Sequence, residues 1–193
     1  MPHSKLYDSI ILKAHDVGEA DRFLILLTRE RGRLSARAKA VRKLTSKLGG
    51  SLLPYNHVTI GLHEGKAGFI VTSAQKLPSP DLTETKPFLN AQQGVELLIS
   101  LLHDDEPLPE IFDLTLEFLR RCSKPEPESV LDFTVNVLRS LGLLPSDNEL
   151  PQSESELNAL CNEIISEHSN IPPKASKIAS LIAINGGAAR HGG

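Results

Sequence analysis

Residues 22–39, "RFLILLTRERGRLSARAK", decide the fold of the first half of the chain. The opening "RFLILLT" is apolar on both faces, which is typical of a buried strand. A turn is expected at Gly32. After it, "RLSARAK" alternates with a period of two, which places Leu34, Ala36 and Ala38 on one face and cations on the other. The stretch therefore predicts two strands, the second of which has one cationic face.

Three further strands are expected around this pair. One covers residues 7–15 and ends at a turn containing Gly18, and two more, residues 57–65 and 67–77, flank Gly65. Five short strands in about eighty residues predict a small closed barrel. Phe23 lies within an apolar strand, so we expect it in the barrel core.

The pattern changes to helix after a proline-rich linker at about residues 77–87. Apolar stripes at helical spacing predict helices near residues 88–102, 109–122 and 131–142, and Ser153 with Glu156 is a candidate capping box for a fourth. A short fifth helix is expected over residues 173–184, and a frayed tail over residues 185–193. The predicted class is α+β (multi-domain), with a five-stranded β-barrel over residues 1–79 and an all-α helical bundle domain over residues 80–193.

The net charge of −3 hides an asymmetry between the two halves. Residues 1–79 carry 13 Lys and Arg against 6 Asp and Glu, a net +7. Residues 80–193 carry 8 against 18, a net −10. Such a division is typical of a chain whose basic half meets a polyanion, and the alternative is a chance distribution of surface charge.

The basic charge is concentrated in residues 31–47, which hold seven basic residues and no acid. Residues on one face of a strand repeat about every 6.6 Å, so a row of cations can follow a phosphate backbone and gain affinity from released counterions. The alternative is a solvated strand face that only prevents edge pairing. The candidate DNA-binding residues are Arg29, Arg31, Arg33, Arg37, Lys39, Arg42, Lys43 and Lys47.

Few aromatic residues accompany these cations in the first half of the chain. Stacking platforms for single strands combine several exposed rings with a basic groove. We therefore expect contacts mainly to the phosphate backbone of the nucleic acid and few to its bases. Binding should then show no sequence preference and include both single and double strands.

The sequence shows no convergent reactive groups, so we expect a binding protein and not an enzyme. It has no Walker-type phosphate loop and no Cys-x-x-Cys pair for a zinc site. We expect His57 and His63 to be ordinary barrel-wall residues, and the acids at 104–106 to form a solvated loop. The two cysteines and the lack of long apolar runs favour a cytoplasmic protein without a membrane span.

Four motifs in this order resemble the RecO family of bacterial recombination mediators. They are "GEADR" (residues 18–22), "LLTRERGRL" (26–34), "AKAVRK" (38–43) and "LGG" (48–50) followed by Pro54. The resemblance covers about residues 5–80 and is a compatible helical pattern thereafter. It implies an N-terminal OB-fold and a helical domain. Glu19, Asp21 and Arg22 match the family signature, and we expect them to fix the first turn locally.

The resemblance also implies a function in DNA repair and recombination. It implies binding of single- and double-stranded DNA, strand annealing, and help in loading RecA onto strands coated with single-stranded DNA-binding protein. The implied partners are that protein and RecR, and the implied location is the nucleoid. The family's DNA-binding positions fall here on Arg33, Arg37, Lys39, Arg42 and Lys43.

Two points remain open. Many family members carry a four-cysteine zinc module in the helical half, and with only two cysteines this chain is expected to bind no cofactor. The alternative function is a protein-interaction adaptor whose basic barrel face binds an acidic peptide or RNA.

Overall fold

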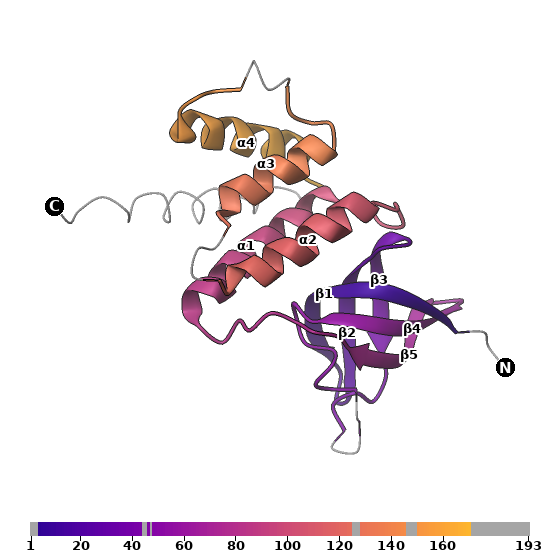
Figure 1. Ribbon diagram of the computed structural model, residues 1–193. Coiled ribbons are helices and arrows are strands. Elements are labelled where there is room, and N and C mark those ends of the chain that lie inside the picture. Colours follow the sequence, from indigo (N-terminus) through magenta and orange to yellow (C-terminus); the bar gives the residue numbers. More distant parts are fainter. Residues whose placement is uncertain (1–3, 44–45, 47, 125–127, 146–149, 171–193) are drawn as a thin grey trace. The chain divides into compact units, whose positions relative to one another are not determined.

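The computed structural model describes residues 4–43, 46, 48–124, 128–145 and 150–170. Within these residues, five strands are followed by four helices, as the ribbon diagram shows (Figure 1). The strands are β1 (Lys5–Val17), β2 (Asp21–Thr28), β3 (Gly32–Ala38), β4 (His57–Gly65) and β5 (Gly68–Lys76). The helices are α1 (Thr85–Leu101), α2 (Pro109–Cys122), α3 (Val130–Ser140) and α4 (Glu154–His168).

The predicted class, a barrel followed by helices, is confirmed. The strands close into a barrel in the order β1-β2-β3-β5-β4. All neighbours are antiparallel except β3 and β5, whose parallel pairing of Ala36 with Phe69 and Arg37 with Ile70 closes the ring. A five-stranded closed barrel of this kind is OB-like. The expected helix at 173–184 and tail at 185–193 lie outside the described residues.

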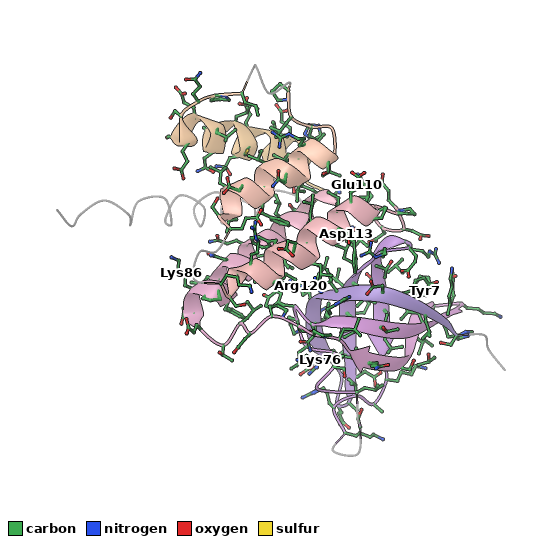
Figure 2. All side chains as sticks on the ribbon, in the orientation of Figure 1. Tyr7, Lys76, Lys86, Glu110, Asp113 and Arg120 are labelled. Atoms are coloured by element: carbon green, nitrogen blue, oxygen red, sulfur yellow. The ribbon has the colours of Figure 1, made fainter. Side chains whose placement is uncertain are left out.

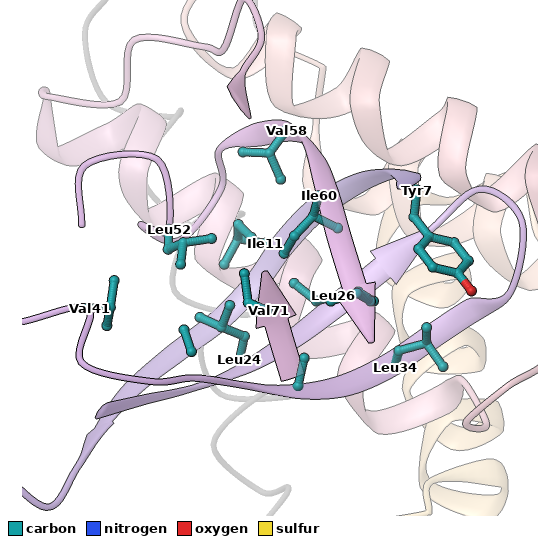
Figure 3. Packing of buried hydrophobic residues seen from close by; sticks show 13 residues of the cluster. Tyr7, Ile11, Leu24, Leu26, Leu34, Val41, Leu52, Val58, Ile60 and Val71 are labelled. Carbon is teal, nitrogen blue, oxygen red and sulfur yellow. The ribbon is translucent and has the colours of Figure 1, made fainter. Parts of the chain in front are cut away.

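The barrel interior is filled by alternate residues of every strand (Figure 3). Leu24 and Leu26 of β2 face Leu34 and Ala36 of β3 across the hairpin, and all four are buried. The interior cluster comprises Tyr7, Ile11, Leu24, Leu26, Leu34, Ala36, Ala38, Val41, Leu52, Val58, Ile60, Leu62 and Val71. The sequence prediction that the apolar face of "RLSARAK" points inward is therefore confirmed.

Phe23 corrects the expectation that it belongs to this core. Phe23 pairs with Arg37, and the next pair along the strands, Leu24 with Ala36, points into the barrel. Because consecutive pairs point to opposite faces, the Phe23 ring lies on the outer face of the barrel. It is only partly buried and is not part of the interior cluster. The prediction was wrong because "RFLILLT" is apolar on both faces, so its pattern cannot show which residues point inward.

A β-bulge in β1 changes the orientation of the residues that follow it. The register of β1 against β2 shifts between Ile11 and Lys13. Without that extra residue, His15 would share the inward orientation of Ile11, because side chains alternate with a period of two. With it, Ala14 turns inward beside Leu24, and His15 turns outward beside Phe23.

The chain forms two compact units, and the first is larger than the predicted barrel domain. It contains Met1–Asp81 together with the docked segment, His103–Arg120, which includes most of α2. Ring contacts of Phe112, on this segment, reach His57 at 6.1 Å and the Arg29 guanidinium at 4.6 Å. The second unit contains Leu82–Leu102 and Arg121–Gly193, and hence α1, α3 and α4.

In the second unit, the described helices bury apolar stripes as the spacing predicted. The Ser129 hydroxyl caps α3 by accepting the backbone N–H of Asp132 at 3.0 Å. Ser153 occupies the N-cap of α4 but makes no side-chain cap hydrogen bond, so the expected capping box with Glu156 does not form.

The two cysteines provide a test of this packing. The exposed fractions of Cys122 and Cys161 are 2% and 1%. Burial raises the pKa of the Cys122 thiol to about 12, and it also raises the pKa of the Cys161 thiol. Because thiolates are the reactive species, we expect neither thiol to react with Ellman's reagent at pH 8 in the folded protein, and both to react in urea. A thiol that reacts rapidly without denaturant would contradict this packing.

Candidate nucleic-acid interface

The structure separates the predicted cations into two groups at opposite ends of β3. We call Arg29, Arg31 and Arg33, around the β2–β3 turn, the turn-end arginines. We call Arg37, Lys39, Arg42 and Lys43, at the end of β3 and in the loop after it, the loop-end cations. Lys47 lies outside the described residues. Whether either group binds DNA stays a prediction, but their surroundings differ.

The turn-end arginines are paired with carboxylates, several of them from the docked segment. Arg29 forms a bidentate pair with Asp113, which projects from α2 (Figure 2). Arg31 pairs in the same way with Asp105, and Arg33 Nε lies 2.7 Å from Asp104 Oδ1. Including pairs made within the barrel, the carboxylates in contact are Asp8, Glu64, Asp104, Asp105 and Asp113.

These contacts shift the pKa values of both partners. A side-chain hydrogen bond from Arg31 lowers the pKa of Asp105, and one from Arg29 lowers that of Asp113. The same bonds raise the pKa values of Arg29 and Arg31. Because both carboxyl pKa values fall on folding, the pairs stabilise the fold at neutral pH, and their contribution is lost as the pH falls through the lowered values.

The backbone holds the acidic loop in the same place. The Asp105 N–H donates to the Arg33 carbonyl at 2.8 Å, and Arg33 and Asp104 form an isolated bridge. The turn-end arginines therefore attach the docked segment to the barrel. Carboxylates occupy the guanidinium groups of these three arginines, and whether the arginines also face a polyanion stays a prediction. The acids at 104–106, expected to form a solvated loop, take part in this contact.

The loop-end cations are exposed, and local contacts hold their backbone. Arg37 has a side-chain exposure of 52%, and its Nε donates to Asp21 Oδ2 at 2.8 Å. The other Asp21 oxygen accepts the Ala40 N–H at 2.8 Å, in a loop where Ala40 has φ 54°. This backbone hydrogen bond is the largest cause of the lowered pKa of Asp21. Asp21 therefore fixes the loop after β3 through partners 16 and 19 positions away in the sequence, and not the first turn for which it was predicted.

Arg42 connects the same loop to the β1–β2 turn. Its guanidinium donates to the carbonyls of Gly18 at 3.2 Å and Glu19 at 3.3 Å, and its Nε lies 3.1 Å from Asp16 Oδ2. Its backbone N–H donates to the Ala20 carbonyl at 3.0 Å. These contacts fix the backbone of residues 37–43 against residues 16–21. Lys39 and Lys43 lie in the fixed segment and are exposed.

The two ends differ in charge balance. Residues 13–22 and 37–43, which meet at the loop end, carry six cations and three carboxylates, and all of them are described. The cations are Lys13, Arg22, Arg37, Lys39, Arg42 and Lys43, and the carboxylates are Asp16, Glu19 and Asp21. The three turn-end arginines, in contrast, contact five carboxylates. A surplus of positive charge is left at the loop end, where a phosphate backbone is attracted.

Two rings lie beside this surplus that sequence reasoning did not identify. His15 and Phe23 are cross-strand partners on the outer face, with ring centroids 5.1 Å apart and planes inclined by 41°. Phe23 in turn pairs with Arg37. The sequence offered one indication for Phe23: a hairpin that closes at Gly32 pairs Phe23 with Arg37, on the cationic face. It offered no indication for His15, because the alternation of apolar and polar residues does not reveal the bulge in β1.

The described residues offer no other site of recognisable chemistry. Among them, no group of three or more His, Cys, Asp or Glu side chains is placed to hold a metal ion. His57 is a barrel-wall residue, as expected, with Nε2 2.6 Å from Asp8 Oδ1. None of the helices in the described ranges combines the length and apolar character that crossing a membrane requires.

Comparison with known proteins identifies similar chains. Residues 2–80 match the family model described as "Recombination protein O N terminal". The chain is 32% identical over 148 residues to the "DNA repair protein RecO" of Myxococcus xanthus (strain DK1622), covering 72% of this chain and 59% of that protein. It is 31% identical over 173 residues to the protein of the same name from Dehalococcoides mccartyi, covering 83% and 65%.

A shorter match is closer in sequence. Over 70 residues the chain is 47% identical to the "DNA repair protein RecO" of Nocardioides sp. (strain ATCC BAA-499 / JS614), covering 36% of this chain and 29% of that protein. The matches thus span between about a third and two thirds of the length of these relatives.

Proposed function

The chain belongs to the RecO family, and from this premise we propose that it is a DNA repair and recombination mediator that acts without catalysis of its own. It binds single- and double-stranded DNA without sequence preference through the loop end of its barrel. The observation that carries the proposal is the surplus of cations there, six against three carboxylates in residues 13–22 and 37–43, with five of the six exposed.

The mechanism follows from the position of these charges. The loop-end cations neutralise phosphates, because within the described residues only two of the four pair with a carboxylate, Arg37 with Asp21 and Arg42 with Asp16. The turn-end arginines are all paired and contribute little to the field felt by DNA. Neutralisation on two strands at once lowers the repulsion that opposes their approach, so that complementary bases test pairing. Strand annealing requires no covalent chemistry, which agrees with a role other than that of an enzyme.

The wider role is proposed on the same premise. The protein assists loading of RecA onto strands coated with single-stranded DNA-binding protein, with that protein and RecR as partners. It acts in the cytoplasm at the nucleoid and needs no metal cofactor. The relatives named above support this role by their names, which describe DNA repair proteins.

Fluorescence anisotropy with a labelled single strand and a labelled duplex, across a salt series, tests the DNA-binding step. We expect log affinity to fall linearly with log salt, with a slope of about −0.7 per neutralised phosphate for the single strand and about −0.9 for the duplex. Random sequences of equal length should bind alike. Binding that is absent at 50 mM salt, or that is independent of salt, would reject the proposal.

A further inference from the structure

A row of three outward side chains crosses β1, β2 and β3 at the loop end of the barrel. The register pairs His15 with Phe23 and Phe23 with Arg37, and cross-strand partners point to the same face. The row exists because the bulge after Ile11 turns His15 outward and because Phe23 has the opposite orientation to Leu24.

Exposure of this outer face increases along the strands toward the loop end. Ile10 and Leu27 are cross-strand partners there and are fully buried. The next pair consists of Lys13, which is exposed, and Ile25, which is partly buried. His15 and Phe23 follow, the first exposed and the second partly buried. The outer face is therefore covered at one end, and its rings lie at the open end.

The two rings form one apolar surface with cations on its border. Their centroids are 5.1 Å apart, which is within the range of aromatic pairs. Arg37 continues the row on one side, half exposed and fixed through its Nε by Asp21 at 2.8 Å. Lys13 and Lys39 are exposed at the border. An aromatic surface beside fixed cations has the chemistry needed for a base and its phosphate together.

We propose that His15 and Phe23 form a stacking surface for an unpaired base of single-stranded nucleic acid, with Arg37 and Lys39 on the adjoining phosphates. The inference rests on the proposed function and adds a preference to it. Bases inside a duplex are already stacked on each other and present no face, so the rings favour single strands over duplexes. The affinity gained corresponds to about 5- to 150-fold per stacked base.

Phe23→Leu tests the proposal, because leucine keeps an apolar side chain at a partly buried position but removes the ring. The probes are a dT oligonucleotide, a duplex of equal length, and an abasic oligonucleotide that carries the backbone alone. We expect a loss of about 10-fold for the dT oligonucleotide and less than 2-fold for the other two. Ile25→Val, on the same outer face, is the matched control and should leave all three affinities within 2-fold.

A second variant gives a direct signal of stacking. The chain contains no Trp, so Phe23→Trp introduces a single indole fluorophore at the site. We expect the dT oligonucleotide to quench its emission and the abasic oligonucleotide to leave the emission unchanged. This measurement also decides the question if Phe23→Leu fails to fold.

The failures of the two proposals are distinguishable. Unchanged dT affinity in Phe23→Leu, or an equal loss on the abasic strand, would overturn the stacking proposal. DNA binding by the loop-end cations would then stand if their substitution still weakened binding. Absence of any DNA binding by the unsubstituted protein would reject both.

Discussion

The double variant Arg37→Gln/Lys39→Gln is expected to bind single-stranded DNA about 65-fold more weakly than the unsubstituted protein at 50 mM salt. Each phosphate contact contributes a slope of about 0.7 for single strands, so losing two makes the salt dependence shallower by about 1.4. If the two proteins bind equally at 1 M salt, this difference in slope makes the affinities differ by roughly 65-fold at 50 mM salt. Lys39 is exposed, and Arg37 loses only its exposed ion pair with Asp21, so the free energy of unfolding should fall by no more than about 1 kcal/mol. Anisotropy titrations across a salt series measure the affinity and the slope together.

The matched control is Arg31→Gln/Arg33→Gln, which removes the same formal charge from the other end of the same strand. Because Asp105 and Asp104 already pair with these arginines, we expect DNA affinity to stay within about 3-fold and the slope to stay nearly constant. The midpoint of urea unfolding should fall, because the variant leaves acids of the docked segment without partners. If this control lost as much DNA affinity as Arg37→Gln/Lys39→Gln, the division into two groups of cations would be wrong.

This division shows where sequence reasoning reaches its limit. The strands, the hairpin turn at Gly32 and the cationic face of β3 all follow from local periodicity, and the structure confirms them. Pairing of Arg33 with Asp104 joins residues 71 positions apart, and that of Arg29 with Asp113 joins residues 84 apart. A local sequence pattern cannot show contacts between residues so far apart. The number of basic residues in a run therefore does not give the positive charge that remains after pairing with carboxylates.

The outward rings were missed for a related reason. A period of two gives the orientation of a residue only if the register is known, and one extra residue reverses it. The bulge after Ile11 does this for His15, and the apolar residues on both faces of β2 hide it for Phe23. As a result, Phe23 was assigned to the core and His15 was not considered for the interface. The sequence therefore predicted contacts to the phosphate backbone of DNA alone, whereas the structure places the His15 and Phe23 rings beside Arg37.

The largest effect on stability is expected from Gly32→Ala at the β2–β3 turn. Gly32 has φ +66°, a conformation that costs other residues about 1–2 kcal/mol. A Cβ there would also lie 1.7 Å from the backbone oxygen of Glu106, so the docked segment must move away. Overpacking of this kind costs about 1–3 kcal/mol. We expect the free energy of unfolding to fall by about 3–4 kcal/mol in a urea titration followed by circular dichroism.

Gly18→Ala separates the two causes, because Gly18 has φ +60° but a Cβ there meets nothing within 4 Å. It should lose only the conformational cost of about 1–2 kcal/mol. The difference between the variants then measures the fit between the β2–β3 turn and the backbone of the docked segment. That fit keeps Asp104 and Asp105 against Arg33 and Arg31, so Gly32→Ala should also expose those arginines and strengthen DNA binding at low salt. Equal losses of stability in the two variants would mean that the docked segment does not press on the turn, and the assignment of the turn-end arginines to a structural role would fail with it.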